Sequence, residues 1–281
     1  MRLTSVAFAN SSAKMRYIFD NDLHIHSFLS LCSKDPAQNP ELILRYAIDN
    51  GLKTVALTNH YWDSVISGAS GFYSKQNYEW LLQSKPLPRA NGVSFLFGCE
   101  TDMDKDLRLG MPLSRFDDFD FVVIPTTHLH MKGFTISEED ASTVEGRARV
   151  WISRFEALLN MELPFHKIGV AHLATSLIAP NREDYLSVLR LLPEDKLFGL
   201  FSKSARLGVG IELNSSDMSF SDGEAETVLR IFKIAKACKC KFYLGSDAHH
   251  PKELNEAKAI FERAIDLLEL TEDDKFQLKD I

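Results

Sequence analysis

Hydrophobic and polar positions alternate along this chain with two different periods. Short runs rich in β-branched and aromatic residues are separated by longer stretches with the 3.6-residue repeat of amphipathic helices. This alternation is typical of βα units, which build a mainly parallel sheet covered by helices. The pattern predicts seven strands, which lie at about 16–26, 54–58, 93–97, 121–124, 168–171, 209–213 and 242–244.

Local signals place the helices between these strands. Asn39 is an expected N-cap before Pro40, and Gly51 is expected to end the same helix. Ser137 is the expected cap of a long helix. We expect residues 1–14 to form a peripheral extension and 15–281 a single domain. The expected helices are 40–49, 138–159, two between 183 and 205, 224–237, and one that ends near 267.

Residues that can bind metal ions follow the predicted strands. His24 and His26 are two residues apart, so in extended chain both rings lie on one face. Of the nine histidines, only His166 precedes a strand. Because loops at the carboxyl ends of barrel strands form one surface, we expect the others to converge there. Besides the first pair, these candidates are His60, Glu100, His128, His130, His172, Asp247, His249 and His250.

Composition narrows the class of protein. A net charge of −7 and a pI near 5.7 argue against a nucleic-acid partner, which needs a clustered basic surface. Four cysteines are too few for a disulfide scaffold in 281 residues, and no membrane-length apolar run accompanies them. We therefore expect a cytoplasmic protein without a membrane partner.

The ordered motifs DLHIHS, LTNH, GCE, TTH, AH and SDAH resemble those of the PHP (polymerase and histidinol phosphatase) family, from about Arg16 to about His250. The resemblance implies an α/β fold, a distorted TIM-like (β/α)7 barrel with a metal site at the carboxyl ends of its strands. It also implies two or three divalent ions and phosphoester hydrolysis. Imidazole and carboxylate ligands suit zinc, manganese or iron.

The resemblance assigns a role to each matching residue. His24, His26 and Asp247 are expected to hold one ion, Glu100 to bridge it to a second ion held with His128 and His172, and His60 and His249 to bind a third. Glu100, Asp247 and His249 are the expected catalytic residues. His130 competes with His128 as a ligand.

The sequence departs from the family after the first motif, where a further histidine or aspartate is common. Cys32 stands at about that place, and Asp35 follows it. We expect Asp35 to be the ligand of the third ion at this place. A partly filled third site is the second alternative, and Cys32 as the ligand is the third.

These features predict a metal-dependent phosphoesterase, similar to histidinol phosphatases, in which metal-activated water hydrolyses a small phosphorylated substrate. Lys132 and Arg182 are candidate phosphate anchors, and Asn214 is a candidate substrate contact. Asp102 is expected to be a solvated loop carboxylate, and Glu212 a buried hydrogen-bond partner. A non-catalytic metal-binding regulatory module and an amidohydrolase-type enzyme are the alternatives.

Overall fold

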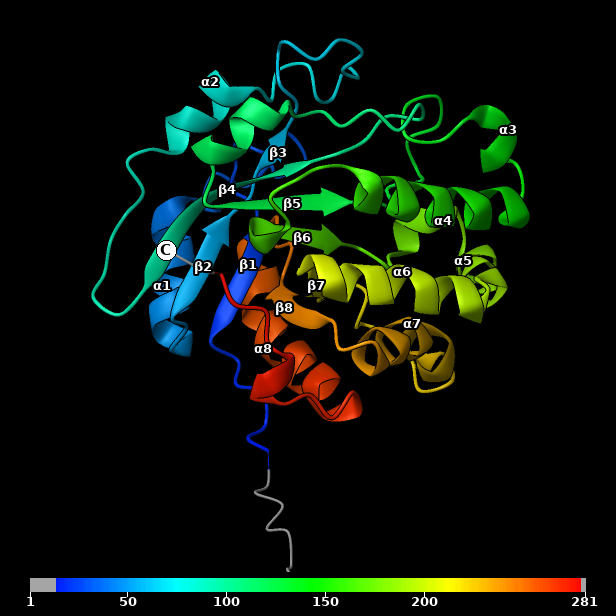
Figure 1. Cartoon of the computed structure of the whole chain (residues 1–281). Coiled ribbons are helices and arrows are strands. Elements are labelled where there is room, and N and C mark those ends of the chain that lie inside the picture. Colours follow the sequence, from blue (N-terminus) through cyan, green and yellow to red (C-terminus); the bar gives the residue numbers. More distant parts are fainter. Residues whose placement is uncertain (1–13, 279–281) are drawn as a thin grey trace, which may run out of the picture.

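The fold is a parallel sheet that curls into a nearly closed barrel (Figure 1). The computed structural model describes residues 14–278. The strand order is β1-β2-β4-β5-β6-β7-β8, and the two-residue strand β3 pairs with β4. The predicted distorted TIM-like barrel is confirmed. Strand bounds are β1 Asn21–Ile25, β2 Thr54–Leu57, β3 His60–Tyr61, β4 Ser94–Thr101, β5 Phe121–Pro125, β6 Ile168–Ala171, β7 Gly210–Asn214 and β8 Lys241–Gly245.

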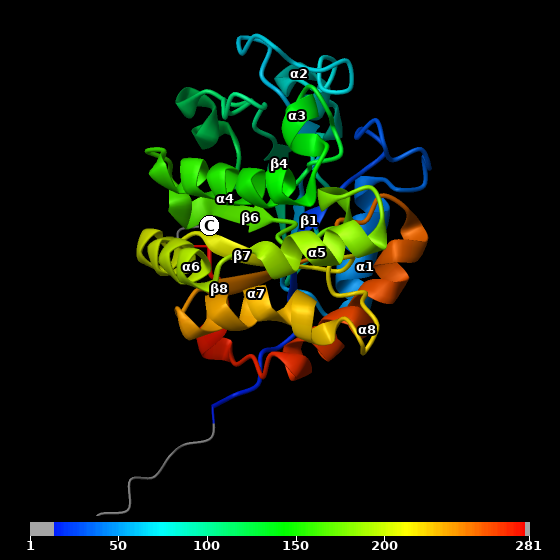
Figure 2. The same ribbon diagram turned by 90° about the vertical axis from the view of Figure 1, so that its right-hand side faces the viewer.

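The helices lie outside the strands, as the two views show (Figures 1 and 2). The α-helices are α1 Pro40–Asn50, α2 Tyr78–Leu81, α3 Glu138–Ala141, α4 Val144–Asn160, α5 Arg182–Leu191, α6 Glu194–Leu207, α7 Ala225–Ala237 and α8 Pro251–Leu267. Short 3-10 helices are η1 Leu82–Ser84, η2 Leu113–Asp118, η3 Phe165–Lys167, η4 Ser176–Ile178 and η5 Glu272–Asp274. Within residues 14–278, no helix has both the length and the apolar character needed to cross a bilayer.

Local signals account for most helix ends. The Asn39 side chain accepts a hydrogen bond from the Leu42 amide, and Gly51 ends α1 in the left-handed conformation, with φ 68°. The helix expected over 138–159 is instead two helices. Thr143 caps the second one by accepting from the Gly146 amide. At this corner a Cβ on Gly146 would lie 2.3 Å from the Asp140 carbonyl oxygen, so only glycine fits.

The first strand differs from its prediction. The run 16–19 is not a strand; Arg16 makes only an isolated bridge to Thr271, and β1 begins at Asn21. Its register against β2 shifts between Asp22 and Ile25.

The interior of the barrel is filled by a small apolar cluster. Apart from Phe276, its members come from strands on different sides of the barrel, so they meet in its interior. Phe276 belongs to this cluster, and its amide donates to the Phe242 carbonyl. This packing leaves the polar site at the opposite, carboxyl end of the strands. The cluster consists of Leu23, Ala56, Leu96, Phe121, Val123, Ala171, Tyr243 and Phe276.

β1 and β8 come together at the closure of the barrel. The Leu244 amide donates to the Asn21 side chain at 3.2 Å, and Ile25 forms a parallel bridge with Ala248. The Asp247 amide donates to the His24 carbonyl at 2.6 Å. The first and last motifs of the sequence therefore meet in space.

Candidate metal centre

The two histidines of the first motif point their outer nitrogens at each other. The Nε2 atoms of His24 and His26 are 3.0 Å apart, and both side chains are fully buried. The Nδ1 atom of His24 lies 2.6 Å from Glu212 Oε1, and that of His26 lies 2.8 Å from Ser30 Oγ. An imidazole whose Nδ1 donates a hydrogen bond presents a lone pair at Nε2. Two lone pairs facing each other fit a shared cation.

Glu212 orients His24 and is itself held by two hydrogen bonds and by close packing against Gly245. Its Oε2 accepts from the His172 amide at 3.0 Å and from the Asn214 side chain at 3.2 Å. A Cβ on Gly245 would lie 2.0 Å from Glu212 Oε1, so this position must be glycine. Glu212 is thus the buried hydrogen-bond partner that its place in a strand indicated. A carboxylate that orients a ligating histidine is a common support for metal sites.

Glu100, at the carboxyl end of β4, stands at the centre of the cluster. It is fully buried, and neither carboxylate oxygen has a hydrogen-bond partner. Burial raises the pKa of this carboxyl, but the surrounding imidazoles lower it by a larger amount, so the pKa lies well below its usual value. Five imidazole nitrogens lie near it: His60 at 2.7 Å, His26 at 3.3 Å, His172 at 3.5 Å, His24 at 3.7 Å and His128 at 3.8 Å.

Asp247 and His172 have strained backbones. Their φ values are 54° and 63°, a region that residues other than glycine rarely adopt. In this conformation, Asp247 Oδ1 is 3.1 Å from His26 Nε2, and Oδ2 is 3.5 Å from His172 Nε2. Local strain of this kind is typical of functional sites, because the surrounding structure must hold it in place.

His249 and His60 extend the cluster outward. The His249 ring stacks on His26 with a centroid distance of 4.2 Å, and its Nδ1 bonds the Asp247 carbonyl oxygen at 2.6 Å. His60 Nδ1 has no hydrogen-bond partner although it lies close to Glu100. Potential ligand atoms form three sets, and within each set the atoms lie within 4.8 Å of one another. The sets are His26 with His60 and His249, His24 with Glu100 and His172, and His24 with His26 and Asp247.

Asp102 was predicted to be a solvated loop carboxylate, and this is wrong. It is fully buried, and its Oδ2 lies 3.0 Å from His128 Nδ1. Its Oδ1 accepts from Arg154 at 2.6 Å. Arg154, on α4, is also fully buried and donates to the carbonyl oxygens of Thr126, Met103, Asp104 and Thr135. The sequence feature that could have indicated this buried pair is Arg154, an arginine on a mostly apolar face of α4.

Four predicted site residues lie outside the cluster. Asp35 is paired with His250 at 3.1 Å, so this histidine, which directly follows the last motif, faces outward with it. Arg182 is paired with Glu224 at 2.6 Å, and exposed Lys132 does not line the cavity over the cluster. Asn214 is buried and occupied by Glu212 and Ser216. None of these four predicted residues lines the cavity over the cluster, whereas Cys32 does.

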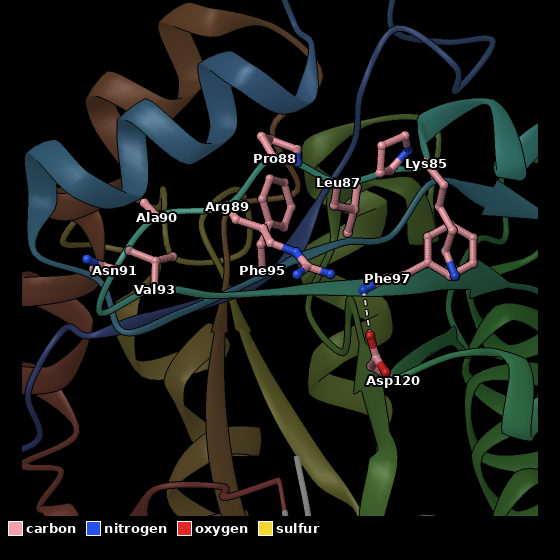
Figure 3. Close-up of a pocket in the computed structure, with 11 residues that line it drawn as sticks. Lys85, Leu87, Pro88, Arg89, Ala90, Asn91, Val93, Phe95, Phe97 and Asp120 are labelled. Atoms are coloured by element: carbon pink, nitrogen blue, oxygen red, sulfur yellow. Dashed lines mark hydrogen bonds between the residues drawn. The ribbon is translucent and has the colours of Figure 1, made fainter.

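A cavity of about 370 Å³ opens over the cluster. His128 and His130 both line it, but only His128 reaches the edge of the cluster. A larger cavity of about 870 Å³ lies elsewhere, beneath residues 85–91 and against β4 (Figure 3). There the one carboxylate, Asp120, accepts from the Phe97 amide at 2.8 Å, and Lys85 lies over the Phe97 ring. This second cavity brings no set of ligands together.

The donor set fits transition-metal ions. It combines imidazole nitrogens with two carboxylates, a mixture that suits zinc, manganese or iron. Both oxygens of Glu100, Nδ1 of His60 and Nδ1 of His172 are buried without hydrogen-bond partners. Buried polar atoms of this kind are costly unless something compensates them. Divalent ions in the cluster would do so for the carboxylate and for imidazole lone pairs that face it.

The fold and the site define a class of protein: a parallel α/β barrel with a histidine- and carboxylate-rich cluster, a candidate metal centre, at the carboxyl ends of its strands. The chain belongs to the PHP family, since the model of the PHP domain matches residues 22–216. The family assignment made from the sequence motifs is thereby confirmed.

The fold is shared with solved structures, among them the following two. Histidinol phosphate phosphatase from Lactococcus lactis, in complex with zinc, L-histidinol and phosphate, has a TM-score of 0.59 at 17% identity, covering 87% of this chain and 93% of that one. A protein assigned as a histidinol phosphatase from Listeria monocytogenes has a TM-score of 0.58 at 13% identity, covering 86% and 99%. No curated protein sequence matches the chain.

Proposed function

We propose that this protein is a metal-dependent phosphoesterase that hydrolyses a small phosphomonoester. The observation that carries the proposal is Glu100, a fully buried carboxylate with no hydrogen-bond partner among five imidazoles. Membership of the PHP family and the fold shared with histidinol phosphatases support phosphoester chemistry. We also propose that residues 15–281 act as one domain, because the strands from residue 21 to 245 form one sheet.

We assign the ligands from the short distances in the cluster. His24, His26 and Asp247 hold one ion, and their ligand atoms lie within 4.8 Å of one another. Glu100 would be shared with a second ion held with His172, because ligand atoms of His24, Glu100 and His172 also lie within 4.8 Å of one another. His128 completes that second site from its edge. His60 and His249 form a third site, and Cys32 lines the same cavity.

When bound, the ions lower the pKa of water and draw charge from the phosphoryl oxygens, as in other multinuclear hydrolases. The protein's own residues prepare this chemistry. Glu212, Ser30 and Asp102 orient three of the imidazoles through their Nδ1 atoms. Glu100 and Asp247 supply negative charge that offsets repulsion between neighbouring cations. Because no lysine or arginine lines the cavity within residues 14–278, phosphate binding depends on the metal centre.

The test is reconstitution of the metal-depleted chain separately with manganese, zinc and iron. Each form is assayed for phosphate release from small phosphomonoesters and for cleavage of phosphodiesters, oligonucleotides and amides. We expect turnover of monoesters that needs metal, with at least two equivalents bound by elemental analysis. Metal binding without hydrolysis of any ester would favour a non-catalytic module, and hydrolysis of amides alone would favour an amidohydrolase.

A further inference from the structure

The cavity over the metal centre has an apolar outer wall. Phe72 and Tyr73 come from the loop after β3, Met131 from the loop after β5, and Leu177 from η4 after β6. The Phe72 ring packs edge-on against His60 with centroids 5.1 Å apart, and at the same distance against Tyr73. Leu177 keeps 37% of its surface exposed, so part of this wall is available to a ligand.

This wall carries no charge that could bind a charged leaving group. The carboxylates lining the cavity are Glu100 and Asp247, and both belong to the metal cluster. No lysine or arginine of residues 14–278 is part of the lining. Two divalent ions, two carboxylates and the phosphoryl dianion of the substrate have charges that cancel, so the centre offers no net negative charge to attract an ammonium group. An ammonium group would also lose hydration without gaining a carboxylate partner.

We propose that the site selects small phosphomonoesters whose leaving group is a neutral apolar ring and disfavours leaving groups that carry an ammonium group. This inference rests on the proposed phosphatase function. A flat ring against Phe72, Met131 and Leu177 removes apolar surface from water on both partners. The volume of about 370 Å³ is near the lower end of the range for ligand sites, roughly 300–1,000 Å³, so the ring is a small one.

The reaction is hydrolysis and needs no other reactant. Water supplies the oxygen that becomes bonded to phosphorus, and the bond from phosphorus to the ring-bearing oxygen breaks. One proton of that water leaves with the aryl alcohol, and phosphate is the other product. The wall acts on the leaving group only, so its contribution is separable from that of the metal centre.

Binding of non-hydrolysable analogues tests the preference without turnover. Calorimetric titrations of the metal-reconstituted full chain compare phenylphosphonate, 2-aminoethylphosphonate and inorganic phosphate. We expect phenylphosphonate to bind about tenfold or more tightly than 2-aminoethylphosphonate. Equal affinities, or tighter binding of the amine, overturn the inference.

Leu177→Ala locates the preference in the wall. It should weaken phenylphosphonate binding by about threefold to tenfold, since each buried methylene group is worth a factor of about four. Binding of inorganic phosphate should not change. Leu191→Ala, at a similarly exposed leucine on α5, is the matched control and should change neither. An equal loss of affinity for phenylphosphonate and inorganic phosphate in Leu177→Ala would show that the wall does not discriminate between leaving groups.

Turnover separates this inference from the proposed function. We compare kcat/KM for phenyl phosphate and for O-phosphoethanolamine. If both esters are cleaved equally well, the phosphatase function holds and the preference is wrong. If phenylphosphonate binds selectively but neither ester is cleaved, the preference holds and the phosphatase function is wrong. If no phosphorus compound binds the metal-loaded protein, both are wrong.

Discussion

Glu100→Gln removes the charge at the centre of the cluster while it keeps the size of the side chain. The carboxylate lies within 3.8 Å of five imidazole nitrogens, so any ion among them feels it directly. At a separation of 4 Å and an effective dielectric constant near 20, one pair of unit charges is worth about 4 kcal/mol. An amide recovers part of this through its carbonyl oxygen.

We therefore expect binding of the bridged ion to weaken about 100-fold or more, which corresponds to about 2.7 kcal/mol. Hydrolysis should fall by a similar factor, in line with the roughly 10²–10³-fold losses seen when one electrostatic group is removed from an active site. The fold should survive, because the cluster lies at the barrel mouth and the apolar interior is unchanged.

The assay combines elemental analysis, phosphate release and thermal unfolding on the same preparations. Glu156→Gln, at an exposed position on α4, is the matched control and should behave like the parent protein in all three. Full metal content together with near-normal hydrolysis in Glu100→Gln would refute the bridging role. Asp247 would then be the carboxylate to test next.

Three further predictions concern other parts of the site. Asp102→Asn should lower metal content and activity about tenfold to 100-fold, because the support of His128 Nδ1 is weakened; unchanged metal affinity by titration would contradict this. His172→Ala should abolish most activity while exposed His166→Ala leaves it nearly intact, and equal losses in folded proteins would contradict the placement of the site. Chelation should lower Tm by roughly 5–10 °C for each ion whose free concentration is 100 times its Kd, because binding at that concentration stabilises the folded state by about 2.7 kcal/mol. An unchanged Tm would argue against metal in the native protein.

The loop after β3 gives a last prediction. A deletion within residues 64–70 should change relative rates among phosphoesters with metal content unchanged, because the loop lines the cavity with Phe72 and Tyr73. Elemental analysis and the ester series measure both effects. Loss of metal in the shortened protein would place this loop in the scaffold of the metal centre.

The sequence by itself determined the type and order of nearly every element. Hydrophobic periodicity and capping residues are local properties, so Asn39, Gly51 and Ser137 could be assigned their roles directly, and the structure agrees. The main candidate ligands were also accessible, because the carboxyl ends of parallel strands must meet at one edge of a barrel. His24, Glu100, His172 and Asp247 were found in this way, and they lie together.

Only the tertiary structure decided what depends on contacts between distant segments. Asp102 and Asp35 are both loop carboxylates, yet the first is buried by Arg154 from α4 and the second is paired outside the cluster with His250. Arg182 is likewise bound by Glu224 from another part of the chain. No local pattern distinguishes these cases, since burial and pairing are set by residues far away in sequence. A strand's position follows from its own residues, but the partner of a charged side chain follows from packing of the whole barrel.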